Sequence, residues 1–256
     1  MQMDRSERML TGMASDKGML RQRNEDSCAI LTGEKGIPDV FVIADGMGGH
    51  SSGETASKLA VDHVIEYIRM DPSIFSKGDG LPERLVSMMR NTHRLVLECS
   101  QTTNAWKGMG TTLTVAVLLE SDLYVGHVGD SRLYILDSSG FRRITSDHSY
   151  TEELIRSGKL TREQARHHPN KNMITRAIGG LEDEVEVDTF VCSLENGSHM
   201  LLCTDGLTNE VDERTIQEII LAAATPQDAC DQLVHTANQN GGRDNITAVI
   251  LRCDDD

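Results

Sequence analysis

The chain has 256 residues, of which 38% are hydrophobic and 4% aromatic, and it carries a formal net charge of −15. This length allows one large domain or two small ones, with a core built mainly from aliphatic side chains. The negative charge argues against a nucleic-acid-binding protein, because binding to a phosphate backbone requires a basic surface.

The first half of the chain is predicted to contain strands followed by two helices. Apolar and β-branched residues favour strands at 9–16, 26–32 and 40–45. Apolar residues at helical spacing predict helices over about 53–69 and 82–102, and the first of these ends before Pro72.

The second half repeats this order. Strands are expected at 111–119, 122–129, 131–137, 140–145, 185–191 and 198–204, then helices over 212–223 and 226–239, and a last strand over 245–253. Thr225 is a good helix N-cap, with Pro226 at the first helical position. Runs of strands joined by short turns indicate antiparallel sheets with helices outside them, an α+β layered fold. No long linker interrupts the chain, so we expect one domain over residues 1–256.

One segment, 146–180, differs from the rest because it is polar and has only short helical pieces. It contains His148, His167 and His168, and the sequence from Thr161 to Gln164 is typical of a capping box at the start of a short helix. We interpret it as a surface insertion between strands.

Six cysteines are present, and their spacing fits neither a CxxC pair nor a zinc site. We therefore expect reduced thiols and a cytoplasmic location. The charged N-terminus lacks the apolar stretch of a signal peptide, and no apolar run approaches membrane-spanning length, so no membrane association is expected.

Four aspartates follow apolar, strand-like runs or precede one. Asp45 and Asp205 each end such a run and are followed by glycine, so each is predicted to lie where a buried strand turns sharply. Asp130 follows the run 123–129, and Asp244 stands just before the last strand. Carboxylates gathered at strand ends are unfavourable unless a positive charge lies among them. The pattern indicates a hard divalent cation bound by oxygen ligands.

Other polar residues are informative only beside these acids. Arg21, Glu25 and Asp26 would alone be an ordinary charged turn, yet a guanidinium near a metal site could hold a phosphate by a bidentate fork. The glycine-rich sequence after Asp45 leads to His50, which could donate a proton or bind phosphate. From spacing alone, a plain surface histidine is the simpler interpretation of His50.

Taken together, these segments resemble the metal-dependent protein phosphatase family, the type 2C serine/threonine phosphatases, in its bacterial branch. The matching segments occur in the family's order between about residues 9 and 252: Arg21 with Asn24-Glu25-Asp26, Asp45-Gly46-Met47-Gly48-Gly49-His50, Gly110-Thr111-Thr112, Gly129-Asp130-Ser131-Arg132, Asp147-His148-Ser149, Thr175-Arg176-Ala177-Ile178-Gly179, Thr204-Asp205-Gly206-Leu207 and Gly242-Arg243-Asp244-Asn245.

The resemblance implies a four-layer α-β-β-α sandwich, in which two antiparallel sheets pack face to face with helix pairs outside. It also implies a site for two Mn²⁺ or Mg²⁺ ions, with a third in bacterial relatives. Asp45 would bridge two ions, Asp205 and Asp244 would bind the first, and the carbonyl of Gly46 would bind the second. Asp130 with Asp205 would bind the third ion. Glu25, Asp26 and Asn245 would support the site, the two acids through waters, and Arg21 would hold the substrate phosphate.

The implied activity is hydrolysis of phosphoserine and phosphothreonine on proteins by a water or hydroxide that bridges the metals. Many eukaryotic members have a histidine directly after the Asp-Gly, proposed as the general acid, where this chain has Met47, as bacterial members do. We therefore hypothesise that a metal-bound water or His50 protonates the leaving group. The segment 146–180 matches the family's flap, and its histidines suggest a role in substrate choice.

The implied partners are phosphoprotein substrates and a cognate Ser/Thr kinase, and we expect a monomer. Two alternatives remain at this stage: an enzyme for small phosphoesters, and an inactive regulatory module on the same fold. The second would lack one or more of the metal-binding acids, all of which this chain keeps.

Overall fold

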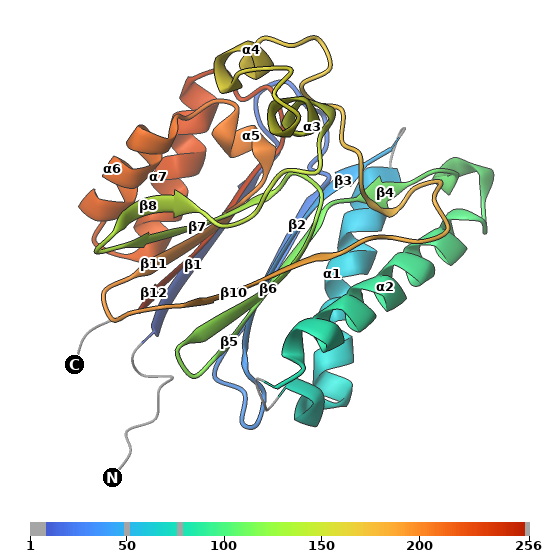
Figure 1. Cartoon of the computed structure of the whole chain (residues 1–256), viewed down its shortest axis with the longest axis horizontal. Coiled ribbons are helices and arrows are strands. Elements are labelled where there is room, and N and C mark those ends of the chain that lie inside the picture. The colour runs from blue at the N-terminus through green and yellow to red at the C-terminus, as the bar shows by residue number, and fades with distance from the viewer. Residues whose placement is uncertain (1–8, 49–51, 76–78, 254–256) are drawn as a thin grey trace.

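The computed structural model describes residues 9–48, 52–75 and 79–253. Within these residues two antiparallel sheets pack face to face (Figure 1). The first sheet has the order β1 (Met9–Asp16), β12 (Ile246–Cys253), β11 (His199–Cys203), β7 (Arg132–Asp137) and β8 (Gly140–Arg143). The second has the order β10 (Asp188–Ser193), β6 (Asp122–Val128), β5 (Leu113–Leu119), β3 (Asp39–Met47), β4 (Gly110–Thr111) and β9 (Ile178–Gly179), and β2 (Asp26–Leu31) pairs with β3.

Helices cover the outer face of each sheet (Figure 1). The second sheet is covered by α1 (Ser52–Met70) and α2 (Leu81–Ser100), and the first by α5 (Asp205–Thr208), α6 (Glu213–Ala222) and α7 (Pro226–Gln239). Two short helices, α3 (Tyr150–Arg156) and α4 (Arg162–Arg166), lie together at one end of the sandwich, and 3-10 turns occupy Pro72–Phe75 and Asn104–Trp106. The predicted four-layer α+β sandwich is confirmed.

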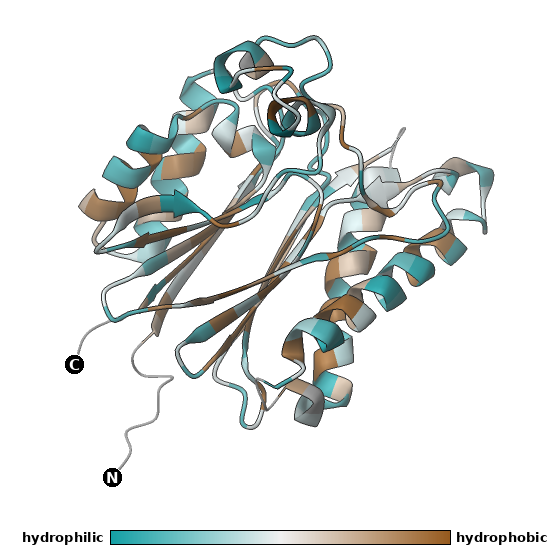
Figure 2. Ribbon diagram, viewed as in Figure 1, coloured by the Kyte–Doolittle hydropathy of each residue, from teal (hydrophilic) through white to brown (hydrophobic). Residues whose placement is uncertain are grey.

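Strand alternation explains the layers, because successive side chains of a strand point to opposite faces of its sheet. In β3, Val40 and Val42 pack with the apolar side of α1 and α2, whereas Phe41 and Ile43 belong to the core between the two sheets. Figure 2 shows the resulting bands of hydrophobic colour along the strands, with the polar colour concentrated on the outer helices and the loops. A third core cluster fills the space between the first sheet and α5, α6 and α7.

Most predicted elements are present, including the Thr225 N-cap and the capping box from Thr161 to Gln164. One strand is shifted: residues 185–187 were expected to belong to β10, which begins at Asp188. The reason is that Asp188 pairs with His127, near the end of β6, so the preceding residues have no partner strand. Val185 instead packs against the core beneath α1 and α2.

Among the described helices, none combines the length and the apolar character needed to cross a lipid bilayer. All six cysteines lie in the described ranges, and each is a thiol rather than half of a disulfide.

Two strand glycines provide a matched test of the layer packing. A Cβ atom on Gly12 in β1 would lie 2.4 Å from the backbone nitrogen of Gln227 at the start of α7, whereas on Gly126 in β6 it would meet the flexible Met89 side chain at 2.5 Å. We expect Gly12→Ala to lower the free energy of unfolding by about 1–3 kcal/mol, because a helix backbone must shift. Gly126→Ala should cost clearly less, because a methionine can change rotamer. Urea unfolding monitored by circular dichroism measures both, and equal losses would contradict this account of β1 and α7.

Candidate metal centre

Four aspartates from distant parts of the sequence line one pocket of about 230 Å³. These are the four that sequence analysis singled out, Asp45, Asp130, Asp205 and Asp244, and the other predicted residues in the lining are Arg21, Glu25, Gly46 and Asn245. The lining contains no His, Cys or Lys among the described residues, and its acidic groups offer only oxygen atoms.

Asp45 lies within β3 rather than at its end. The strand was expected to turn sharply after Asp45, but it continues to Met47, and Gly46 pairs with Thr111 of β4. Thr112 fixes this position, because its hydroxyl accepts a hydrogen bond from the Asp45 N–H at 2.8 Å and its own N–H donates to the Asp45 carbonyl at 2.8 Å. Gly46 is required by close packing rather than by a turn, since a Cβ there would lie 2.1 Å from the carbonyl oxygen of Gly53.

Asp205 is the first residue of α5, directly after β11, so the second Asp-Gly does mark a change of direction. Gly206 allows α5 to approach the loop before β12, because a Cβ there would lie 1.9 Å from the carbonyl oxygen of Asn245. Asn209, the C-cap residue of α5, donates from its side-chain amide to Asp205 Oδ2 at 3.0 Å and so orients that carboxylate.

The remaining two aspartates lie in connections that contain glycines with positive φ. Asp130 follows Gly129 (φ 111°) between β6 and β7, and Asp244 follows Gly242 (φ 52°) between α7 and β12. These backbone conformations are favourable only for glycine, so the turns place both carboxylates at the same end of the sandwich as Asp45.

Burial and mutual repulsion disfavour ionisation of Asp45, Asp130 and Asp205. Burial, followed by the charges of neighbouring aspartates, raises the pKa of Asp45 and of Asp130 well above the usual range. Burial and the charge of Asp244 likewise raise the pKa of Asp205, and burial raises that of Glu25. Carboxylates with raised pKa values, gathered in one pocket, favour a cation as their partner.

Asp26 lies behind the pocket and directly opposite Asp45, because the two residues are paired in register on β2 and β3. Its Oδ2 accepts hydrogen bonds from the hydroxyls of Thr204 at 2.9 Å and Thr247 at 2.6 Å. Its Oδ1 is buried and has no hydrogen-bond partner among the described residues. Burial raises the pKa of Asp26 to about 7, even though the two threonine hydroxyls favour its charged form. Sequence analysis did not identify Thr204 and Thr247 as the residues that hold this carboxylate.

Arg21 and Asn245 organise the mouth of the pocket. The Arg21 guanidinium is about half exposed, and its Nη2 donates to Asp244 Oδ2 at 2.8 Å. The Asn245 side chain accepts from the Glu25 N–H at 2.8 Å and donates to the carbonyls of Lys17 at 2.9 Å and Arg23 at 2.8 Å. One carboxamide therefore fixes both ends of the connection that carries Arg21.

The pocket lining fits a hard divalent cation, since its acidic side chains offer only oxygen atoms, and the Asp26 Oδ1 without a partner lies behind them. In the described ranges, no three acidic, histidine or cysteine side chains converge into a group that could hold a metal ion by themselves. Asp244, which is paired with Arg21, would exchange that partner on binding an ion.

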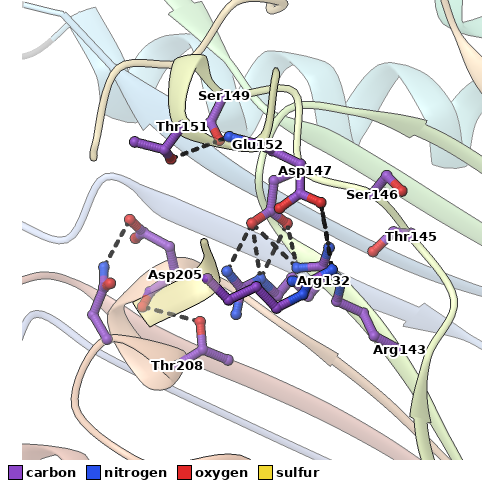
Figure 3. Close-up of polar contacts among 12 residues, drawn as sticks. Arg132, Arg143, Thr145, Ser146, Asp147, Ser149, Thr151, Glu152, Asp205 and Thr208 are labelled. Carbon is purple, nitrogen blue, oxygen red and sulfur yellow. Dashed lines mark hydrogen bonds and ion pairs between the residues drawn. The ribbon is translucent and has the colours of Figure 1, made fainter. Parts of the chain in front are cut away.

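The flap, residues 146–180, is anchored beside the pocket by buried ion pairs. Asp147 accepts from Arg132 Nη2 at 2.7 Å and from Arg143 Nη1 at 3.3 Å, and Figure 3 shows both guanidinium groups directed at this carboxylate. Although burial opposes ionisation of Asp147, the positive charge of Arg132 lowers its pKa. Ser149 caps α3 by accepting from the Glu152 N–H.

None of the three flap histidines lines the pocket, so their role in substrate choice stays a prediction. His148 is buried: its Nδ1 accepts from the Gly129 N–H at 3.1 Å, and its Nε2 lies 3.2 Å from Asp188 Oδ2. His167 and His168 are not among the pocket-lining residues. The flap residues that line the pocket are Asn172 and Ile174, which the sequence gave no reason to single out. His50, the remaining predicted catalytic residue, lies outside the described residues.

The raised pKa of Asp26 predicts how stability depends on pH. An acid whose folded pKa is raised stabilises the fold at low pH, and this contribution is lost as the pH rises through the folded value. We therefore expect the free energy of unfolding of the metal-stripped protein to fall as the pH rises from about 4, near the ordinary pKa of an aspartate, to about 7, the pKa of Asp26 in the fold. Asp26→Asn should make this loss smaller.

Urea unfolding at pH 5.5 and 7.5 measures the effect, with the exposed Asp183→Asn as the matched control. The same decrease in wild type and Asp26→Asn would show that Asp26 does not contribute to it.

Comparisons with known proteins identify the family of the chain. A family model described as protein phosphatase 2C matches residues 20–249. The serine/threonine phosphatase stp of Listeria monocytogenes serotype 4b (strain F2365) is 35% identical over 240 residues, covering 94% of each chain.

Solved structures are similar over nearly the whole chain. The S. agalactiae serine/threonine phosphatase has a TM-score of 0.89 and 33% identity, covering 96% of this chain and 100% of its own. The catalytic domain of the serine/threonine protein phosphatase PstP, solved in complex with two manganese ions, has a TM-score of 0.82 and 30% identity, covering 97% and 99%. With the family model and the relatives agreeing over the same residues, the chain belongs to the protein phosphatase 2C family.

Proposed function

We propose that this chain is a metal-dependent serine/threonine protein phosphatase, which removes phosphate from phosphoserine and phosphothreonine in proteins. The observation that carries this proposal is the pocket itself: buried carboxylates with raised pKa values face an exposed guanidinium, on a chain of this family. Carboxylates alone would repel a phosphate, so the arrangement is suited to this substrate only with cations bound among them.

The residues we assign to two Mn²⁺ or Mg²⁺ ions are Asp45, the Gly46 carbonyl, Asp205 and Asp244, and a third ion would use Asp130 with Asp205. Glu25 and Asp26 would act on the ions through waters, and Asn245 would hold the backbone of Glu25 in place. Bound divalent cations would lower the pKa of water toward neutrality and offset charge on the phosphoryl oxygens. The PstP structure with two manganese ions supports the number of ions.

The chain's own residues would orient the substrate. Arg21 is exposed at the mouth of the pocket, and its planar guanidinium can bind two phosphate oxygens at once. In the present arrangement one of its N–H groups is bonded to Asp244, so a phosphate would compete for that contact. The described lining offers no other side-chain cation, which makes Arg21 the best candidate for the phosphate-binding residue.

The general acid is a separate proposal. Met47 lines the pocket and cannot donate a proton, and the described lining contains no histidine. We assign protonation of the leaving alkoxide to water or to His50, which is three residues beyond Met47.

We further infer a cytoplasmic location, a single catalytic domain over residues 1–256 with residues 146–180 as its flap, a monomeric state and a cognate Ser/Thr kinase as partner. The six thiols support a reducing compartment. Relatives named serine/threonine phosphatases support phosphoproteins as the substrates. An inactive module is disfavoured because Asp45, Asp130, Asp205 and Asp244 all line one pocket.

Metal-dependent turnover is the first prediction of this function. The chelator-stripped protein should release no phosphate from a phosphothreonine peptide, and adding Mn²⁺ or Mg²⁺ should restore release. Asp205→Asn should lower kcat/KM by at least about 100-fold, because it removes a charged ligand. Arg21→Ala should mainly raise KM, with Arg21→Lys recovering part of the loss.

Asp183→Asn, at an exposed residue outside the pocket lining, is the control for charge removal. A folded sample without turnover under either metal would count against the proposed activity. Faster hydrolysis of sugar phosphates or nucleotides than of phosphopeptides would favour the small-phosphoester alternative.

The role of His50 is tested by changing the leaving group. If His50 protonates the leaving oxygen, His50→Ala should slow phosphothreonine hydrolysis by about 100-fold, because general acid catalysis contributes that much for a poor leaving group. Hydrolysis of p-nitrophenyl phosphate should change little, since nitrophenolate leaves without a proton. An equal effect on the two substrates, or no effect on either, would assign protonation to water.

A further inference from the structure

The connection between β1 and β2 exposes two large apolar side chains beside the pocket. Met19 is 67% exposed and Leu20 is 70% exposed, and they come directly before Arg21, which lines the pocket. Single exposed apolar residues are common on protein surfaces. Two adjacent ones directly before a residue of the pocket lining are a different case, because a ligand held by Arg21 extends toward its neighbours in the chain.

The backbone that carries these side chains is held firmly. The N–H groups of Met19 and Leu20 both donate to the carbonyl of Gly242, at 2.7 and 3.3 Å. Gly18 has φ 78°, and a Cβ there would lie 2.1 Å from the Asp244 carbonyl oxygen, so only glycine allows the connection to pack this closely. Together with the Asn245 hydrogen bonds to Lys17 and Arg23, these contacts keep the apolar pair in one place.

A third exposed apolar residue lies in the flap, between two residues that line the pocket. Met173 is 46% exposed, and its carbonyl accepts from the Tyr150 N–H at 2.8 Å. Its neighbours Asn172 and Ile174 line the pocket. In the β1–β2 connection and in the flap alike, exposed apolar residues are therefore next in sequence to residues of the pocket lining.

We propose that Met19 and Leu20, with Met173 of the flap, form a docking surface for the residues next to the phosphorylated serine or threonine. This inference rests on the proposed function and specifies its substrate class: protein segments with a large apolar residue beside the phosphorylated one. Consecutive Cα atoms are about 3.8 Å apart, so when Arg21 holds the phosphate, a flanking side chain is within reach of Leu20.

The two arginines of the β1–β2 connection suit the same occupant. Arg21 is paired with Asp244 at 2.8 Å and Arg23 with Glu54 at 3.8 Å, and both guanidinium groups are about half exposed. A phosphorylated segment brings a dianion that can compete for these exposed ion pairs, while its apolar neighbour can cover Met19 and Leu20. Guanidinium groups beside exposed apolar surface match a phosphopeptide better than a purely apolar ligand.

The test compares three phosphothreonine peptides of equal length and charge, with the full chain and Mn²⁺. One has Leu on the N-terminal side of the phosphothreonine, one has Leu on the C-terminal side, and one has Ser at both positions. We expect kcat/KM to be about tenfold higher for at least one Leu peptide than for the Ser peptide. The double variant Met19→Ser/Leu20→Ser should lose this preference while it hydrolyses p-nitrophenyl phosphate at the wild-type rate.

The matched control is Met70→Ser/Leu221→Ser, which removes two exposed apolar side chains, 87% and 63% exposed, on α1 and α6. It should keep the peptide preference. The temperatures of unfolding of both double variants verify that they fold.

Three results would overturn the proposal: no preference in the wild type, a preference that survives Met19→Ser/Leu20→Ser, or an equal loss on peptides and p-nitrophenyl phosphate. Sedimentation of the wild type but not the double variant with vesicles of anionic phospholipid, without a peptide preference, would assign the surface to membranes. Failure of the proposed function itself would look different, because no phosphate would then be released from any of the four substrates.

Discussion

Repulsion among buried carboxylates is the constraint on which the rest of this structure depends. Asp26 and Asp45 face each other across two neighbouring strands, an arrangement that destabilises a sheet when both groups are charged. Asp130, Asp205 and Asp244 approach the same pocket from three other connections. The two sheets hold these acids together because the aliphatic core between them is extensive, so the fold tolerates an unfavourable site that cations can turn into a favourable one.

A small number of neutral groups keep this arrangement in order. Thr204 and Thr247 bind one oxygen of Asp26, and Thr112 binds the backbone of Asp45 on both sides. Asn245 joins the last strand to both ends of the β1–β2 connection. Because these groups carry no charge, they position the acids without neutralising them. The repulsion among the carboxylates therefore persists, and a bound cation would relieve it.

The sequence predicted the layers and the acids well, because strand alternation, helix caps and Asp-Gly pairs are local signals. It could not show that Gly46 continues a strand, since that depends on pairing with Thr111 and on contact with Gly53, both distant in sequence. It pointed to histidines in the flap, but His148 is buried in hydrogen bonds to the scaffold. No local sequence pattern marks Asn172 and Ile174 as functional residues, because only the folded position of the flap brings them into the pocket lining.

The way in which the flap is attached has a consequence for how related enzymes can diverge. Its first residues, Asp147 and His148, are bonded to Arg132 and to the N–H of Gly129, on either side of Asp130. A substitution at Asp147 or His148 would therefore disturb the position of the Asp130 carboxylate. Residues 157–164 are mostly exposed and lie away from those bonds. Substitutions in the outer part of the flap can therefore accumulate without disturbing the bonds at its base or the carboxylates beneath it.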